Sequence, residues 1–157
     1  MILQLIHLAQ AALAAYGGKH SYVAITNLRK YENTTKKLAK VSSEAEHQRQ
    51  KTYSTQTSGV VALLLSFFAS LLLASRGSIY GVLPRYLIPV VMVVALFFAK
   101  EHMQDFWAGK APGLKGALPK MGDYEEAQRR THSLLGVLDL LMLSWVATWI
   151  MALFVGY

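Results

Sequence analysis

Residues 58–75 read SGVVALLLSFFASLLLAS, a stretch whose only polar side chains are serines. A helix needs about 20 mostly apolar residues to cross the hydrocarbon core of a bilayer, and fewer suffice when flanking side chains reach the interface. The whole chain has the same character, because 54% of its 157 residues are hydrophobic, 16% are charged and the mean hydropathy is +0.30. This composition is too apolar for an ordinary soluble domain, so we predict an integral membrane protein.

Three further apolar segments satisfy the same test. Together the four segments predict an all-α fold, a single polytopic domain over 1–157 in which four transmembrane helices form a bundle. The predicted spans cover about 2–25, 58–75, 80–99 and 134–156. The segments 26–57 and 100–133 then lie on one side of the membrane and are predicted to be basic loops.

The distribution of Lys and Arg predicts the orientation. All but two of the sixteen basic residues lie in the two long connections or at the adjacent end of the first span, and the exceptions are Arg76 and Arg85. Basic connections stay on the inner side of a membrane. We therefore predict that these connections face the cytoplasm or the mitochondrial matrix and that both termini face out. Endoplasmic reticulum and mitochondrial inner membrane stay open as locations.

Each basic connection contains a pattern that starts a helix. Ser43-Glu44-Ala45-Glu46 and Asp123-Tyr124-Glu125-Glu126 both place a capping side chain three residues before a Glu, as in a capping box. Return helices are therefore predicted to begin near Ser43 and Asp123. The Gly-rich loop before Asp123 is basic, and its lysines are predicted to bind anionic lipid headgroups: Lys110, Lys115 and Lys120.

Several classes of chemistry are excluded by what the chain lacks. Without Cys there are no disulfides, thiolate metal sites or Cys nucleophiles. No Gly-rich phosphate loop, His-Glu-x-x-His pair or nucleophile elbow occurs. The basic residues lie between long apolar runs and do not form a stripe with stacking aromatics, so nucleic acid is not a predicted partner. No cofactor is evident, although the histidines are compatible with a metal or haem.

Three histidines are predicted at the inner face: His20 ends the first span, His102 ends the third and His132 begins the fourth. With Glu101 and Asp105 beside them, they are candidate ligands of a metal site or members of a proton-transfer site. The favoured interpretation is that they are interfacial side chains solvated by headgroups and water. A shared depth does not by itself bring side chains on different helices together.

Asp139 is an acid inside the fourth predicted span, about 8 Å past its apolar boundary at 1.5 Å per residue. It shares a helical stripe with His132 and Gly136, at spacings i, i+4 and i+7. An ionisable group at this depth needs a partner. One interpretation is a structural tie to another helix, for instance to Ser66, Ser70 or a His. The other is a catalytic site in which Asp139 is a base or proton relay and His132 orients or ligates the substrate or metal.

His7 lies near the outer face on a stripe with Ala11 and Ala14. A lone His among small residues is predicted to form hydrogen bonds between helices. The large aromatic side chains near the ends of the spans are predicted to pack in the bundle or to lie at the membrane interface: Trp107, Trp145, Trp149 and Tyr157.

Two stretches carry a resemblance to a known group. Leu5-Ile6-His7-Leu8, followed by small residues and Gly17-Gly18, opens the first span, and Gln128-Arg129-Arg130-Thr131-His132, followed by Gly136 and Asp139, opens the last. In these features the chain resembles small four-helix membrane proteins: the transmembrane protein 205-like family, the fungal anthrone-oxygenase-like proteins and the copper-resistance D-like domains. The resemblance implies the number and order of helices. Members of this group range from oxygen-using enzymes to metal-handling proteins, so it selects no activity.

The favoured function is a non-catalytic accessory subunit, or an assembly or transport factor, of a larger membrane complex. It is supported by the missing enzyme motifs, the small residues of the first span and the short chain. Its predicted partners are the lipid bilayer and other membrane protein subunits. The alternative is a membrane-embedded oxidoreductase, oxygenase or metal-handling protein that uses His132 and Asp139.

Overall fold

The structure is a computed structural model that describes residues 2–39, 43–76, 79, 81–110 and 122–155. The described residues form four α-helices: α1 (Ile2–Ala39), α2 (Ser43–Arg76), α3 (Val82–Lys110) and α4 (Gly122–Val155). The predicted all-α fold is therefore confirmed.

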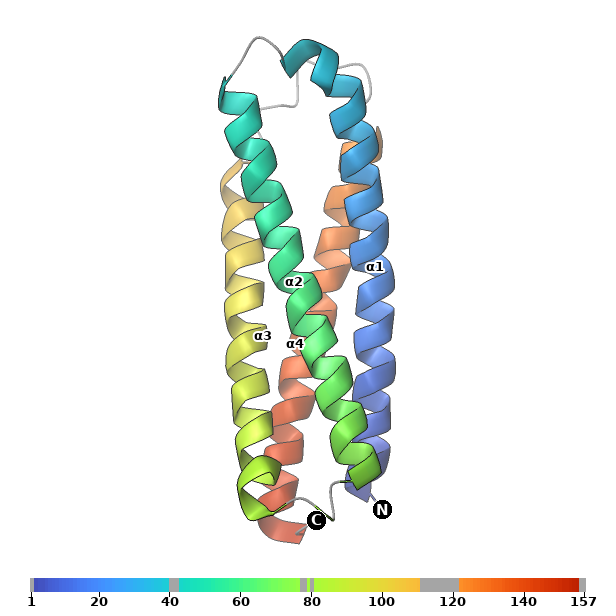
Figure 1. The fold of residues 1–157 in the computed structure, drawn as a ribbon, viewed down its shortest axis with the longest axis vertical. Coiled ribbons are helices and arrows are strands. Elements are labelled where there is room, and N and C mark those ends of the chain that lie inside the picture. Colours follow the sequence, from blue (N-terminus) through green and yellow to red (C-terminus); the bar gives the residue numbers. More distant parts are fainter. Residues whose placement is uncertain (1, 40–42, 77–78, 80, 111–121, 156–157) are drawn as a thin grey trace.

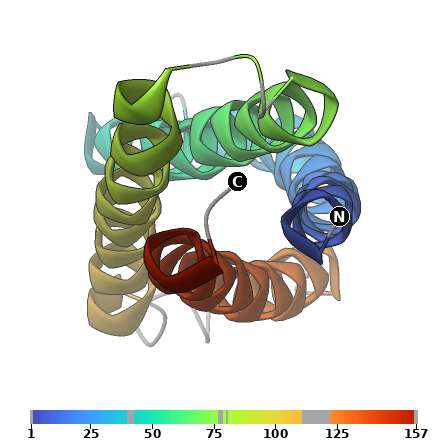
Figure 2. The same ribbon diagram turned by 90° about the horizontal axis from the view of Figure 1, so that it is seen from below.

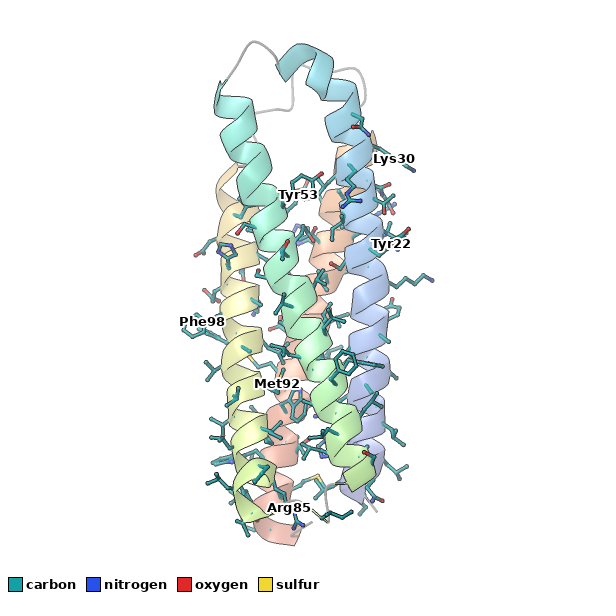
Figure 3. All side chains as sticks on the ribbon, viewed as in Figure 1. Tyr22, Lys30, Tyr53, Arg85, Met92 and Phe98 are labelled. Carbon is teal, nitrogen blue, oxygen red and sulfur yellow. The ribbon has the colours of Figure 1, made fainter. Side chains whose placement is uncertain are left out.

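The helices run up and down in chain order (Figure 1). α1 packs against α2 and α4, and α3 packs against the same two helices. Seen along the bundle, α1 and α3 therefore stand at opposite corners of a square (Figure 2). The first turn of α1 and the last turn of α4 lie at the same end (Figure 1). Figure 3 places Arg85 at this end, and Lys30 and Tyr53 toward the other.

Three of the described helices are long and apolar enough to cross a membrane, over Tyr53–Ser75 in α2, Val82–Trp107 in α3 and Glu126–Phe154 in α4. This finding supports contact with a lipid bilayer. α1, which was predicted to span the membrane over 2–25, is not among these helices. Its mean hydropathy is lowered by the polar side chains of Gln4, His7 and Gln10, which interrupt an otherwise apolar sequence.

The first basic connection is shorter than predicted, because α1 continues past residue 25 to Ala39. No Gly or Pro interrupts the chain between Lys19 and Ala39, so nothing in this stretch strongly opposes a helix. The extension also has packing partners. Leu28 forms a small core with Trp107 and Ala127 near the end of the bundle opposite the start of α1.

The return helices begin where the capping patterns predicted. α2 begins at Ser43, and α4 begins at Gly122, one residue before Asp123. The acidic and basic residues that follow these positions are therefore helical, and they lengthen α2 and α4 beyond their apolar spans.

Gly17 marks the closest approach between three helices. A Cβ atom at this position would lie 2.8 Å from Cδ2 of Leu63 in α2 and 2.9 Å from Cγ1 of Val137 in α4. α1 therefore contacts both of its neighbours here with no room for a side chain. From this level the main core continues among α2, α3 and α4, with fully buried Leu73, Leu96, Leu138, Leu141 and Trp145.

Replacing Gly17 with Ala is expected to lower the free energy of unfolding by about 1–3 kcal/mol, the usual cost of overpacking. Val137 is β-branched and cannot turn aside easily. Gly59→Ala is the matched control, because its Cβ would meet chiefly the flexible end of Met103, 2.7 Å from Sδ. Both variants gain the same helix propensity, so the difference between their free energies of unfolding reports the packing at Gly17. Denaturant titration in detergent micelles measures it, and equal stabilities would contradict the close packing.

Candidate functional site

α3 and α4 form a groove of about 540 Å³ that opens to the side of the bundle. It is lined by Lys100, Gln104 and Trp107 from α3 and by His132, Leu135, Gly136 and Asp139 from α4. His132 and Asp139, predicted to share a stripe of α4, therefore line one groove. This groove is the candidate site, because it gathers acidic, basic and imidazole side chains beside an indole.

Asp139 is paired with a residue that the sequence analysis did not consider. Lys100 Nζ donates to Asp139 Oδ1 over 2.7 Å, and the two side chains are 23% and 43% exposed, respectively. Asp139 thus lies at the open side of the bundle and not in its interior. An intramembrane acid is expected to have a charged or hydrogen-bonding partner, and here that partner is a cation on the neighbouring helix.

The predicted ties from Asp139 to Ser66 or Ser70 are wrong. Ser66 Oγ accepts a hydrogen bond of 2.9 Å from Trp145 Nε1, and Ser70 Oγ donates to the Ser66 carbonyl oxygen over 2.7 Å. Both serines are buried among core residues. They hold α4 to α2 and bond within α2, whereas Asp139 faces α3.

The three inner-face histidines do not come together. His132 lines the groove, while His102 is exposed on α3 and is not part of the groove lining. His20 is buried on α1, and its ring packs edge-on against the Tyr16 ring with the two ring centroids 4.6 Å apart. Neither ring nitrogen of His20 has a hydrogen-bond partner in the described part of the chain. In that same part, no three His, Asp or Glu side chains are grouped closely enough to hold a metal ion. Of the predicted lipid-binding residues, Lys110 is the last residue of α3, and Lys115 and Lys120 lie outside the described residues.

A chain of polar contacts joins α1 to α4 inside the bundle. His7 Nδ1 and Gln10 Oε1 lie 2.8 Å apart, and Gln10 Nε2 donates to Ser144 Oγ over 3.2 Å and to Thr148 Oγ1 over 3.0 Å. His7 also lies against the Trp145 ring, with centroids 5.7 Å apart. His7, predicted to form hydrogen bonds between helices, is therefore buried against α4, but its bond to Gln10 lies within α1 and Gln10 makes the hydrogen bonds to α4.

A second tie of the same kind lies nearer the other end of the bundle. Gln56 Nε2 in α2 donates to Thr131 Oγ1 in α4 over 2.9 Å, and both side chains are buried.

Of the aromatic side chains predicted to pack or to lie at the interface, Trp145 and Trp107 are buried, as packing residues should be, and Trp149 is 37% exposed. Tyr157 lies outside the described residues.

Lys100, Gln10 and Gln56 were missed by the sequence analysis. The charge pattern assigned Lys100 to the basic connection and gave it no partner. Lys100 directly follows an apolar run, however, and lies on a helix antiparallel to α4. A cation at that depth is a natural partner for Asp139. Gln10 follows His7 by three residues and so lies on the same helical face, a spacing that could have indicated a shared interior role.

Comparison with known protein families, curated proteins and solved structures finds no match to this chain. The resemblance to the transmembrane protein 205-like, anthrone-oxygenase-like and copper-resistance D-like proteins therefore stays a prediction.

The interior hydrogen bond of Trp145 can be tested by removing its donor alone. Trp145→Phe is expected to lower the free energy of unfolding by about 1–3 kcal/mol, because it keeps most of the ring packing but leaves buried Ser66 Oγ without its donor. Trp149→Phe on the same helix is the control, and as a change at a partly exposed position it should stay within about 0.5 kcal/mol. Thermal unfolding in detergent compares the two, and an equal loss from both would contradict the tie.

Proposed function

We propose that this protein is a non-catalytic subunit of a membrane assembly and that all four helices cross the bilayer. Two of the three polar side chains that lower the hydropathy of α1 point into the bundle. His7 and Gln10 are 0% and 1% exposed and bond inside the bundle, whereas Gln4 is exposed in the first turns of the helix. The outer surface of the same segment is mainly apolar, with exposed Ile2, Leu5 and Leu8. A lipid-facing helix needs an apolar exterior, and polar groups turned toward other helices satisfy that need.

The proposed orientation follows from the charges at the two ends of the bundle. Arg76 and Arg85 lie toward the end that contains the start of α1 and the end of α4, and the other fourteen basic residues lie in the sequence between Lys19 and Lys51 or between Lys100 and Arg130. The positive-inside rule then favours both termini outside and the α1–α2 and α3–α4 junctions in the cytoplasm or the matrix.

Cysteine labelling tests this topology, because the natural chain contains no Cys. In intact membranes, a membrane-impermeant maleimide is expected to label Ile2→Cys and Gly81→Cys from the outer side. Asn33→Cys, at an exposed position of α1, should react only after permeabilisation. If α1 does not span the membrane, Ile2→Cys will also react only after permeabilisation, as Asn33→Cys does, and this result would overturn the four-span proposal.

The observation that carries the subunit proposal is a second groove, between α1 and α2. It has a volume of about 360 Å³ and an almost wholly apolar lining that includes Ala14, Ala15, Gly18, Leu64 and Phe67. Small residues let the backbone of another transmembrane helix approach closely, which is how helices commonly associate in lipid. A Cβ atom at Gly18 would meet nothing within 4 Å, in contrast to Gly17 beside it. We propose that a helix of the partner subunit lies in this groove.

The alternative, a metal-handling or oxygen-using enzyme, is favoured by the shared groove of His132 and Asp139. Two observations argue for the subunit instead. The Asp139 carboxylate is already engaged by Lys100, and His20 and His102 do not join His132 in the groove lining. A catalytic role for His132 and Asp139 therefore remains the second proposal.

Gentle purification from native membranes, followed by mass spectrometry and metal analysis of one sample, separates the two. We expect stoichiometric membrane subunits and no bound metal. Gly18→Leu should fill the α1–α2 groove and release the partner while the bundle stays folded. Ala12→Leu, at an exposed position of α1 outside the groove, should retain it. A chain that purifies without partners and carries one metal or haem would instead support the enzyme.

A further inference from the structure

We propose that the groove between α3 and α4 binds one zwitterionic phospholipid with an ammonium headgroup, of the phosphatidylethanolamine class. The phosphate and ammonium lie beside Lys100 and Asp139, and the acyl chains follow the outside of α3 and α4. The inference rests on α3 and α4 crossing a membrane, and it is independent of the partner groove on α1 and α2.

The charges in the groove suit a ligand that carries both signs. Its lining contains one basic side chain, Lys100, and one acidic side chain, Asp139, beside the amide of Gln104 and the imidazole of His132. An anionic lipid would be attracted to Lys100 but repelled by the Asp139 carboxylate. A zwitterionic headgroup places its phosphate near the cation and its ammonium near the anion, so both interactions are favourable.

The ion pair retains hydrogen-bonding capacity for this headgroup. The 2.7 Å contact uses one of the three N–H donors of Lys100 Nζ and one of the two oxygens of Asp139. In the described part of the chain neither side chain has a second bonding partner. The phosphate can therefore accept from Lys100, and a primary ammonium can donate to Asp139, without the pair having to break. A quaternary choline group has no N–H to donate, which favours ethanolamine.

The depth of the pair matches that of a headgroup. Lys100 follows Val82 by eighteen residues, and Asp139 precedes Val155 by sixteen. At 1.5 Å per residue these separations are about 27 Å and about 24 Å along the helices. The hydrocarbon core of a bilayer is about 30 Å thick. If the end of the bundle that contains the start of α3 and the last turn of α4 lies at one membrane surface, the Lys100–Asp139 pair lies close to the headgroup layer of the opposite surface.

Exposed apolar side chains on both helices form tracks that run from the groove toward the start of α3 and the end of α4. On α4, Leu143, Val146 and Ile150 follow Asp139 at spacings of four, seven and eleven residues, and all three are exposed. On α3, Phe97 and Val90 lie seven residues apart on one helical stripe that begins one turn before Lys100, and both are exposed. Acyl chains covalently attached to the headgroup would cover these tracks, which a soluble zwitterion could not do.

The first test fills the groove. A Cβ atom at Gly136 would meet nothing within 4 Å, so Gly136→Leu should occupy the groove without disturbing the core. Ser133→Leu lies at nearly the same depth on α4, is exposed and is outside the groove lining. After equilibration in mixed micelles of phosphatidylethanolamine, phosphatidylcholine and phosphatidylglycerol, native mass spectrometry counts the lipids retained by each full-length variant. Wild type and Ser133→Leu should retain one phosphatidylethanolamine, and Gly136→Leu should lose it.

The second test changes the charge. Wild type should prefer phosphatidylethanolamine to phosphatidylcholine by about fivefold, the ratio expected from one net hydrogen bond of about 1 kcal/mol that choline cannot donate. It should also prefer phosphatidylethanolamine to phosphatidylglycerol, because the anionic lipid supplies no ammonium to Asp139. Asp139→Asn leaves Lys100 unbalanced and should reverse this preference toward phosphatidylglycerol. Lys100→Gln should reject phosphatidylglycerol more strongly than wild type does.

Three outcomes would overturn the proposal. These are equal lipid retention by Gly136→Leu and Ser133→Leu, a preference that does not respond to Asp139→Asn, and a partner polypeptide that Gly136→Leu displaces in place of lipid. Failure of the partner proposal would be seen in a different experiment, in which membrane subunits co-purify with Gly18→Leu as well as they do with the wild type.

Discussion

Polar side chains at membrane depth must find partners within the protein, because hydrocarbon offers none. If α1 crosses the bilayer with the other three helices, as we propose, that constraint accounts for the way α1 and α2 contact α4. Gln10 donates to two hydroxyl oxygens on α4 and also contacts His7. Trp145 donates to Ser66 on α2. Because hydrocarbon offers these groups no other hydrogen-bond partner, each bond favours the rotation of its helix that allows the bond to form. The apolar core among these contacts then packs closely enough that Gly17 has no room for a methyl group.

The same constraint separates the interior of the bundle from its outside. Inside the bundle, the side chains of Gln10, Gln56 and Trp145 donate hydrogen bonds to hydroxyl oxygens of neighbouring helices. The charged pair of Lys100 and Asp139 lies instead at the open side of α3 and α4. Burying two charges costs more than their attraction returns unless further hydrogen bonds satisfy them. A lateral groove near the headgroup layer supplies such bonds from lipid or water.

The two grooves differ in chemistry and therefore in what they suit. The α1–α2 groove is apolar and lined partly by small residues, as expected where another helix packs. The α3–α4 groove is charged and polar above an apolar track, as expected for an amphiphile. They lie between different pairs of helices, so a partner subunit and a bound lipid need not compete.

The sequence by itself determined the number and order of the helices, the start of α2 at Ser43 and the interior role of His7. These follow from local patterns: apolar runs, capping residues and the spacing of one helical face. It did not determine that α1 continues to Ala39, because that depends on contacts such as Leu28 with Trp107.

Only the tertiary structure decided that Asp139 pairs with Lys100 and that His20 and His102 stay apart from His132. A sequence shows the depth of each side chain, which follows from 1.5 Å of rise per residue. It does not show the rotation of each helix about its axis, which results from the packing of all four helices. Whether two side chains at one depth meet depends on that rotation.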